Sequence, residues 1–128
     1  MCILIVEDDN ELRETFERML CDMGYAVASA SNGRSALERI REKTPTLAFI
    51  DLLMPVMTGF DLIEQMKADG EMSKIPIVAM TAAWKARVEG VLTMKKPFCA
   101  EAALELVEAY CGAPDIDPTN LLPTGTSG

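Results

Sequence analysis

In the stretch Leu47-Ala-Phe-Ile-Asp51-Leu-Leu-Met-Pro55-Val-Met-Thr-Gly59, four apolar residues run directly into one aspartate. A short apolar run of this kind is typical of a strand that is buried on both faces of a parallel sheet. Asp51 would then stand at the carboxyl end of that strand, where parallel α/β sheets place their sites. Pro55 and Gly59 end the strand and turn the chain. Alone, Asp51 needs no role beyond ending a strand, but three other apolar runs also end in reactive side chains.

The remaining apolar runs predict four more strands and the helices between them. We expect strands over residues 2–6, 25–30, 75–80 and 91–94. The first helix would begin with Asn10 as its N-cap and stop at Gly24. Three more helices would follow Asn32-Gly33, Gly59 and the fifth strand. Their predicted inward faces are Leu12, Phe16, Met19, Leu20 and Met23; Ala36, Leu37 and Ile40; Phe60, Ile63 and Met66; and Ala103, Leu104, Val107 and Tyr110.

Strands that alternate with helices predict an α/β fold with right-handed crossovers. The expected architecture is a three-layer sandwich around a five-stranded parallel sheet in the flavodoxin-like order 2-1-3-4-5. Residues 1–112 would form this domain, and residues 113–128, rich in Pro, Thr and Gly, would form a flexible tail or linker.

Composition excludes several classes of function. The chain has 128 residues and a net charge of -8, which disfavours direct binding to nucleic acid. It contains no histidine, so neither a Ser-His-Asp nor a Cys-His mechanism is available. The four cysteines lack metal-binding spacing and are interpreted as reduced thiols of a cytoplasmic protein. We see no signal peptide and no apolar stretch of membrane-spanning length.

The predicted strand order brings chemically reactive ends together. Glu7 and Asp8, Asp51, Thr81 and Lys96 would follow four adjacent strands. Two like charges a few ångströms apart cost about 4 kcal/mol at an effective dielectric constant of 20, so the carboxylates need counter-charges. Lys96 would supply one, and a hard divalent cation, best Mg²⁺, the rest. This set suggests phosphoryl transfer to Asp51 as nucleophile, with the Thr81 hydroxyl donating to a phosphoryl oxygen.

Each member also has a simpler explanation when taken alone. The acidic run Glu7-Asp8-Asp9 could merely begin a helix, Thr81 could bond locally, and Lys96 could be a solvated surface charge. Their joint placement at adjacent strand ends makes these explanations poor.

Four motifs in this order resemble the receiver domain of bacterial two-component response regulators, over about residues 1–112. They are Ile3-Leu-Ile-Val-Glu-Asp-Asp9, Asp51-Leu-Leu-Met-Pro-Val-Met-Thr-Gly59, Ile77-Val-Ala-Met-Thr-Ala82 and Lys96-Pro-Phe98.

The resemblance implies a role for each matching residue. Asp51 would be the phosphoacceptor, Glu7 and Asp8 would hold Mg²⁺ together with Asp51, and the backbone carbonyl of Leu53 would be a further ligand. Thr81 and Lys96 would contact the phosphoryl group. The donor would be a phosphohistidine on a sensor histidine kinase or a histidine phosphotransfer protein, and a downstream output protein or domain would receive the signal. Such a domain is a regulatory switch and not an enzyme.

Two departures from the family pattern bear on the output. Only residues 82 to 95 separate Thr81 from Lys96, so the fourth helix of the family should be short, irregular or absent. Thr93 stands where the family often has an aromatic switch residue, and Trp84 could take over part of that surface. Leu53 and Ala83 are apolar near the expected path of the hydrolytic water, which predicts a long-lived acyl phosphate.

Two alternatives stay open. One is a degenerate receiver that acts as a phosphorylation-independent docking module, which the shortened fourth helix favours. The other is a flavodoxin-like enzyme or nucleotide binder, but no glycine-rich phosphate loop follows the first strand.

Overall fold

The computed structural model describes residues 2–54, 57–83, 86–96 and 99–112. It contains a single sheet of five strands in the order β2-β1-β3-β4-β5, and every neighbouring pair is parallel. The predicted fold class and strand order are therefore confirmed. The elements, in chain order, are β1 (Ile3–Val6), α1 (Asn10–Asp22), β2 (Val27–Ala30), α2 (Gly33–Glu42), β3 (Leu47–Asp51), α3 (Gly59–Ala68), a 3-10 turn (Met72–Lys74), β4 (Ile77–Thr81), β5 (Leu92–Lys95) and α4 (Ala100–Cys111).

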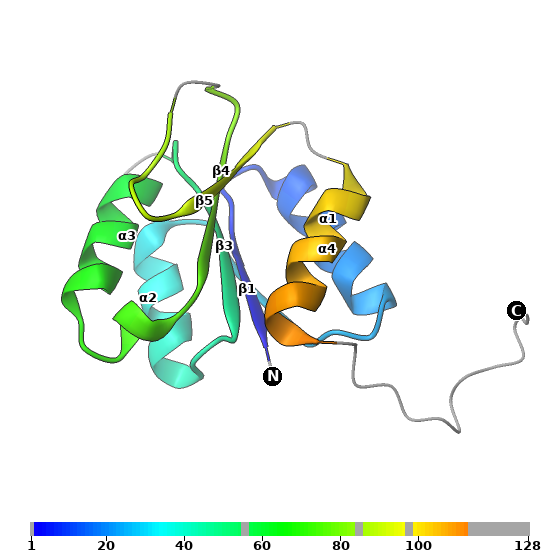
Figure 1. Cartoon of the computed structure of the whole chain (residues 1–128), viewed down its shortest axis with the longest axis horizontal. Coiled ribbons are helices and arrows are strands. Elements are labelled where there is room, and N and C mark those ends of the chain that lie inside the picture. The colour runs from blue at the N-terminus through cyan, green and yellow to red at the C-terminus, as the bar shows by residue number, and fades with distance from the viewer. Residues whose placement is uncertain (1, 55–56, 84–85, 97–98, 113–128) are drawn as a thin grey trace, which may run out of the picture.

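Helices cover both faces of the sheet, with α2 and α3 on one side and α1 and α4 on the other (Figure 1). Alternate residues of each strand pack into the two resulting cores, because successive side chains point to opposite faces of the sheet. On β1, Leu4 and Val6 join the core under α2 and α3, whereas Ile3 and Ile5 join the core under α1 and α4. The apolar runs that carry no alternation are thus explained by burial on both faces.

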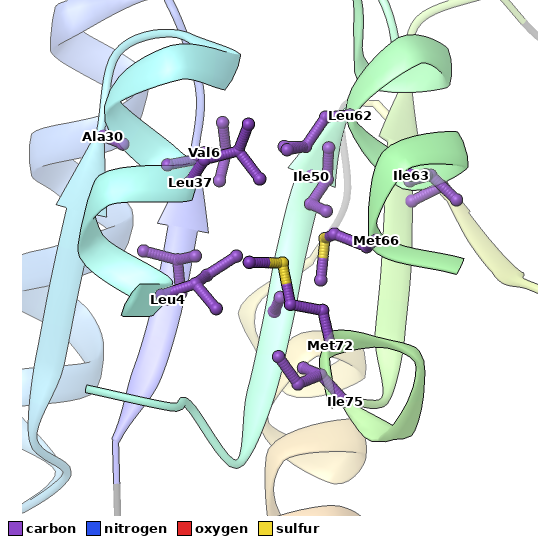
Figure 2. Packing of buried hydrophobic residues seen from close by; sticks show 14 of the residues in the cluster. Leu4, Val6, Ala30, Leu37, Ile50, Leu62, Ile63, Met66, Met72 and Ile75 are labelled. Atoms are coloured by element: carbon purple, nitrogen blue, oxygen red, sulfur yellow. The ribbon is translucent and has the colours of Figure 1, made fainter. Parts of the chain in front are cut away.

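The core under α2 and α3 is built from aliphatic and methionine side chains. In Figure 2, Leu4 and Val6 of β1 lie beside Leu37 of α2, and Ile50 of β3 lies beside Leu62 and Met66 of α3. The core on the opposite face contains an aromatic pair, Phe16 and Phe49, whose ring centroids lie 4.9 Å apart. The edge-to-face arrangement of these rings pins α1 against the centre of β3.

The first helix begins one residue earlier than predicted. Asp9, and not Asn10, is the N-cap of α1, because its carboxylate accepts a hydrogen bond from the Leu12 N–H at 3.1 Å. Asn10 lies inside the helix and accepts a hydrogen bond from Arg13 instead. The predicted start of α2 is confirmed, since Asn32 caps it by accepting from the Ser35 N–H.

Three predicted core residues are exposed. Met23 is 42% exposed because α1 ends at Asp22 and Met23 only caps it. Phe60 is 39% exposed because α3 buries Leu62 beside Ile63 and Met66. Tyr110 is 46% exposed because α4 buries Ala103, Val107 and Cys111, which follow one another at intervals of four residues. The strands β1, β2, β4 and β5 also begin one or two residues later than predicted.

The connection between β4 and β5 contains no helix in its described residues, 82–83 and 86–91, which agrees with the expected loss of the fourth helix of the family. Ala86, Val88 and Val91 nevertheless pack against the core under α2 and α3. Lys67 of α3 donates a hydrogen bond to the Glu89 carbonyl at 2.9 Å and holds the connection beside that helix. Trp84 lies outside the described residues.

The four cysteines are free thiols, as predicted. None of the described helices has the length and apolar character that crossing a membrane requires. The predicted tail, residues 113–128, lies outside the described residues.

Candidate functional site

The carboxyl edge of the sheet collects the predicted site residues. Glu7 follows β1, Asp51 ends β3, Thr81 ends β4 and Lys96 follows β5. Asp51 is 4% exposed and Thr81 is fully buried. The register pairs Thr81 with Lys95, and the Lys96 N–H donates to the Thr81 carbonyl at 2.7 Å. The sheet therefore brings together four side chains that are distant in the sequence.

Lys96 joins two buried carboxylates. Its Nζ lies 2.5 Å from Oε1 of Glu7 and 3.3 Å from Oδ2 of Asp51. The Lys96 side chain is 16% exposed, and the carboxylate side chains are nearly inaccessible. The opposite charges attract each other more strongly here than at the surface, but the cost of removing them from water offsets much of that attraction.

Three carboxylates stand close enough to share one cation. Glu7, Asp8 and Asp51 each offer an oxygen, and these oxygens lie within 4.8 Å of one another. Glu7 and Asp51 are buried, whereas Asp8 is exposed. Three negative charges exceed the single positive charge of Lys96, and oxygen donors of this kind suit a hard divalent cation such as Mg²⁺. The residues present thus fit the predicted metal.

Burial perturbs the proton equilibria of this cluster. Burial raises the pKa of Glu7 to about 7, and the neighbouring Asp51 adds to the rise, against the opposing hydrogen bond from Lys96. For Lys96, burial lowers the pKa, but the contacts with Glu7 and Asp51 outweigh burial and leave it raised. The lysine therefore stays charged, and the excess negative charge is relieved at Glu7.

Thr81 ends β4, the strand beside β3, and Leu53 follows β3 two residues after Asp51. The hydroxyl oxygen of Thr81 accepts a hydrogen bond from the Ala83 N–H at 3.0 Å, so the hydroxyl keeps its own proton for donation. The Leu53 N–H donates to Oδ1 of Asp51 at 3.3 Å, which places the Leu53 backbone beside the acid. The Leu53 side chain is 54% exposed, and Ala83 is also exposed.

Two residues contribute in ways that the sequence reasoning missed. Gly59 was interpreted only as a turn residue, but a Cβ there would lie 2.1 Å from the Asp51 carbonyl oxygen. Arg13 was not singled out at all, although its Nη1 donates to the Glu7 carbonyl at 2.9 Å. For Gly59 the available signal was its spacing in the sequence, eight positions after Asp51 in the second motif. For Arg13 the sequence offers no comparable signal.

The fold and the site define a class: a flavodoxin-like α/β domain with an acidic cluster, a hydroxyl and a lysine at the carboxyl edge of its sheet. The family model of the response regulator receiver domain matches residues 3–106. The chain belongs to this family, whose members are regulatory signalling domains of two-component systems.

Individual relatives agree with this assignment. Response regulator MprA of Mycolicibacterium vanbaalenii is 33% identical over 114 residues, which cover 84% of this chain and 48% of that protein. Chemotaxis protein CheY4 of Vibrio cholerae is 27% identical with a TM-score of 0.76, over 85% of this chain and 97% of that one. The receiver domain of sensor histidine kinase PA1611 from Pseudomonas aeruginosa, solved with a magnesium ion in its active-site cleft, shares the fold at 23% identity, with a TM-score of 0.76 over 88% and 98% of the two chains. The chain spans about half the length of the curated relatives it matches.

Proposed function

We propose that this chain is a phosphoacceptor switch that takes a phosphoryl group onto Asp51 from a phosphohistidine of a sensor histidine kinase or histidine phosphotransfer protein. The observation that carries the proposal is the position of Lys96 between Glu7 and Asp51 at the carboxyl edge of the sheet. A lysine shared by an acceptor and a metal ligand can move onto the phosphoryl oxygens once Asp51 is phosphorylated.

In the transfer, a carboxylate oxygen of Asp51 forms a bond to phosphorus while the bond between phosphorus and the donor imidazole nitrogen breaks. The imidazole leaves with that electron pair, and the product on Asp51 is an acyl phosphate. Lys96 then neutralises one phosphoryl oxygen, and the Thr81 hydroxyl donates to another. These groups position and neutralise charge, which is what phosphoryl transfer needs most, so the lack of histidine in the chain is no obstacle.

Glu7, Asp8 and Asp51 would hold Mg²⁺ through their carboxylates, and Leu53 through its backbone carbonyl. When bound, the ion supplies the positive charge that offsets the phosphoryl oxygens and the acidic cluster. The magnesium-containing receiver domain of PA1611 supports this part of the proposal at the level of the shared fold. We place the switch in the cytoplasm, where it would assist only its own phosphorylation and dephosphorylation and pass the signal to an output protein or domain.

A second candidate is a degenerate receiver that docks a partner without phosphorylation. The β4–β5 connection favours it, because its described residues form no helix and the usual signalling surface is altered. Thr93, half-buried, donates to the Val91 carbonyl at 3.4 Å and offers no aromatic ring to couple to Thr81.

The test is the intact mass of the protein after incubation with acetyl phosphate and Mg²⁺. We expect one phosphoryl group on the wild type and on Asp22→Asn, an exposed aspartate at the end of α1, but none on Asp51→Asn. Modification of Asp51→Asn to the same extent would move the acceptor elsewhere. No modification of any variant would favour the docking module.

We also expect the acyl phosphate to be long-lived, since the exposed Leu53 and Ala83 side chains offer no polar group to orient water. After the acetyl phosphate is removed, loss of the phosphoryl group can be followed by intact mass, with a Mg²⁺-free sample as the control. Leu53→Asn should shorten the lifetime of the acyl phosphate several-fold. Loss within seconds from the wild type alone would contradict this.

A further inference from the structure

Arg13 of α1 is half-buried beside the acidic end of β1. Its Nη1 donates to the Glu7 carbonyl at 2.9 Å, and its Nη2 donates to Oδ1 of Asn10 at 2.6 Å. Two nitrogens of one rigid guanidinium therefore connect the residue that leaves β1 with the first turn of α1. Both acceptors are uncharged oxygens.

The turn that Arg13 holds, residues 7–10, carries two of the proposed Mg²⁺ ligands, Glu7 and Asp8. Further contacts hold the same turn: the Asp9 carboxylate caps α1, and the Asp9 N–H donates to Oε2 of Glu7 at 3.2 Å. The backbone of Glu7 is thus held by Arg13, and its side chain by Asp9 and Lys96.

Two electrostatic effects oppose a cation at this place, although the neighbouring carboxylates of Glu7, Asp8 and Asp9 attract one in the metal-free protein. A positive charge in the first turns of a helix opposes the helix dipole, and beside a metal site it repels the metal. What the position does use is the fork geometry of arginine, which a single ammonium group cannot reproduce.

We infer that Arg13 is a positioning residue for Mg²⁺ binding, holding the Glu7–Asp8 turn in the geometry in which its carboxylates and Asp51 can share one ion. This inference rests on the proposed function. It assigns Arg13 an effect on Mg²⁺ affinity that is opposite in sign to the effect of its charge.

The decisive variant is Arg13→Lys, which keeps the charge but loses the fork. Arg13 lines a hollow of about 330 Å³, so a differently shaped side chain fits without overpacking. The matched control is Arg18→Lys, an exposed arginine of the same helix. Mg²⁺ affinity is measured by calorimetry, the rate of phosphorylation by acetyl phosphate is measured against Mg²⁺ concentration, and thermal unfolding without metal reports on the fold.

We expect the Mg²⁺ dissociation constant of Arg13→Lys to rise about tenfold, as is usual when a group that orients a metal ligand is removed. The phosphorylation rate should recover at saturating Mg²⁺, and Arg18→Lys should match the wild type. A further variant, Arg13→Met, should bind Mg²⁺ no more tightly than the wild type despite the loss of a repelling charge.

Unchanged affinity in Arg13→Lys, or tighter binding in Arg13→Met, would show that only the charge matters and would overturn the inference. A rate deficit that persists at saturating Mg²⁺ would do the same, because it would indicate general damage. If the wild type itself does not respond to Mg²⁺, the proposed function fails, and the inference fails with it. A wild type that responds to Mg²⁺ together with Arg13 variants that bind Mg²⁺ equally well would be a different result. It would overturn the inference on Arg13 and leave the proposed function standing.

Discussion

At the scale of single residues, Gly59 shows how closely the backbone packs around the candidate acceptor. Its N–H donates to the Leu52 carbonyl at 3.0 Å, and an added Cβ would lie 2.1 Å from the Asp51 carbonyl oxygen and 2.6 Å from the Leu52 Cα. These are backbone atoms, which cannot rotate away as a side chain would. Glycine at this position lets the start of α3 close over the end of β3.

We therefore expect Gly59→Ala to lower the free energy of unfolding by about 3 kcal/mol and to slow phosphorylation of Asp51, because the clash displaces the acceptor backbone. Urea denaturation and the acetyl phosphate rate measure the two effects. The matched control is Gly70→Ala, where an added Cβ meets nothing within 4 Å. Equal stability of the two alanine variants would show that the contact is easily relieved.

Glu7 makes the stability of the metal-free protein depend on pH. Its pKa is raised from 4.5 to about 7 by burial, so the folded state binds its proton more tightly than the unfolded state does. The stability that this proton contributes is complete below pH 4.5 and is lost as the pH rises through 7. Each pKa unit corresponds to about 1.4 kcal/mol, so the effect is on the order of 3 kcal/mol.

The pH prediction is tested by urea denaturation in EDTA between pH 5 and pH 8. The free energy of unfolding of the wild type should fall relative to that of Glu7→Gln, whose amide cannot ionise. Parallel pH profiles for the two proteins would contradict the perturbed titration of Glu7.

At the scale of elements, one hydrogen bond ties the start of the second strand to the end of the last helix. The Tyr25 hydroxyl, just before β2, donates to the Gly112 carbonyl at the end of α4 at 3.0 Å. This hydrogen bond joins the turn after α1 to the C-terminal end of the last helix, 87 residues later. It supplies a partner for a carbonyl that the end of a helix leaves without one.

Removal of this bond by Tyr25→Phe should cost about 1 kcal/mol of unfolding free energy, because the ring stays buried and only the hydroxyl is lost. Tyr110→Phe is the matched control, since Tyr110 is 46% exposed. Chemical denaturation of both variants is the measurement. A Tyr25→Phe variant as stable as Tyr110→Phe would show that water replaces the hydroxyl without loss.

Strands and helices were predictable from the sequence where burial alone sets the pattern of apolar residues. The apolar runs of β1 and β3 are continuous because both sheet faces are covered, and their short length favours a strand over a helix. Helix ends were less predictable, because Asp9 and Asn10 are both good N-caps and a single hydrogen bond to Leu12 decides between them. The prediction that Phe60 faces the core was wrong, because Leu62 occupies the buried face of α3 instead.

At the scale of the whole molecule, the excess negative charge of the chain matters most at the carboxyl edge of the sheet. The net charge is -8, and three carboxylates lie together there, two of which pair with Lys96. A divalent cation that binds only the folded state would stabilise the entire domain by mass action.

We expect Mg²⁺ at about one hundred times its dissociation constant to raise the free energy of unfolding by about 2.7 kcal/mol. Asp8→Asn should lose most of this gain, and because Asp8 is exposed its loss should leave the fold intact. Asp22→Asn should keep the gain. Thermal unfolding with and without Mg²⁺ gives the answer, and an equal response of all three proteins would place the ion elsewhere.

The sequence by itself determined the order of strands and helices, the flavodoxin-like sheet and the identity of the acidic, hydroxyl and lysine residues at its carboxyl edge. It could do so because apolar runs, turn residues and strand ends are local properties of the chain. Only the tertiary structure decided that Lys96 joins Glu7 to Asp51, that Arg13 holds the Glu7 backbone and that the β4–β5 connection packs on the core without a helix in its described residues. The contact between Lys96 and Glu7 spans 89 positions, and side-chain geometry across such a separation is set by the packing of the whole sheet and its helices.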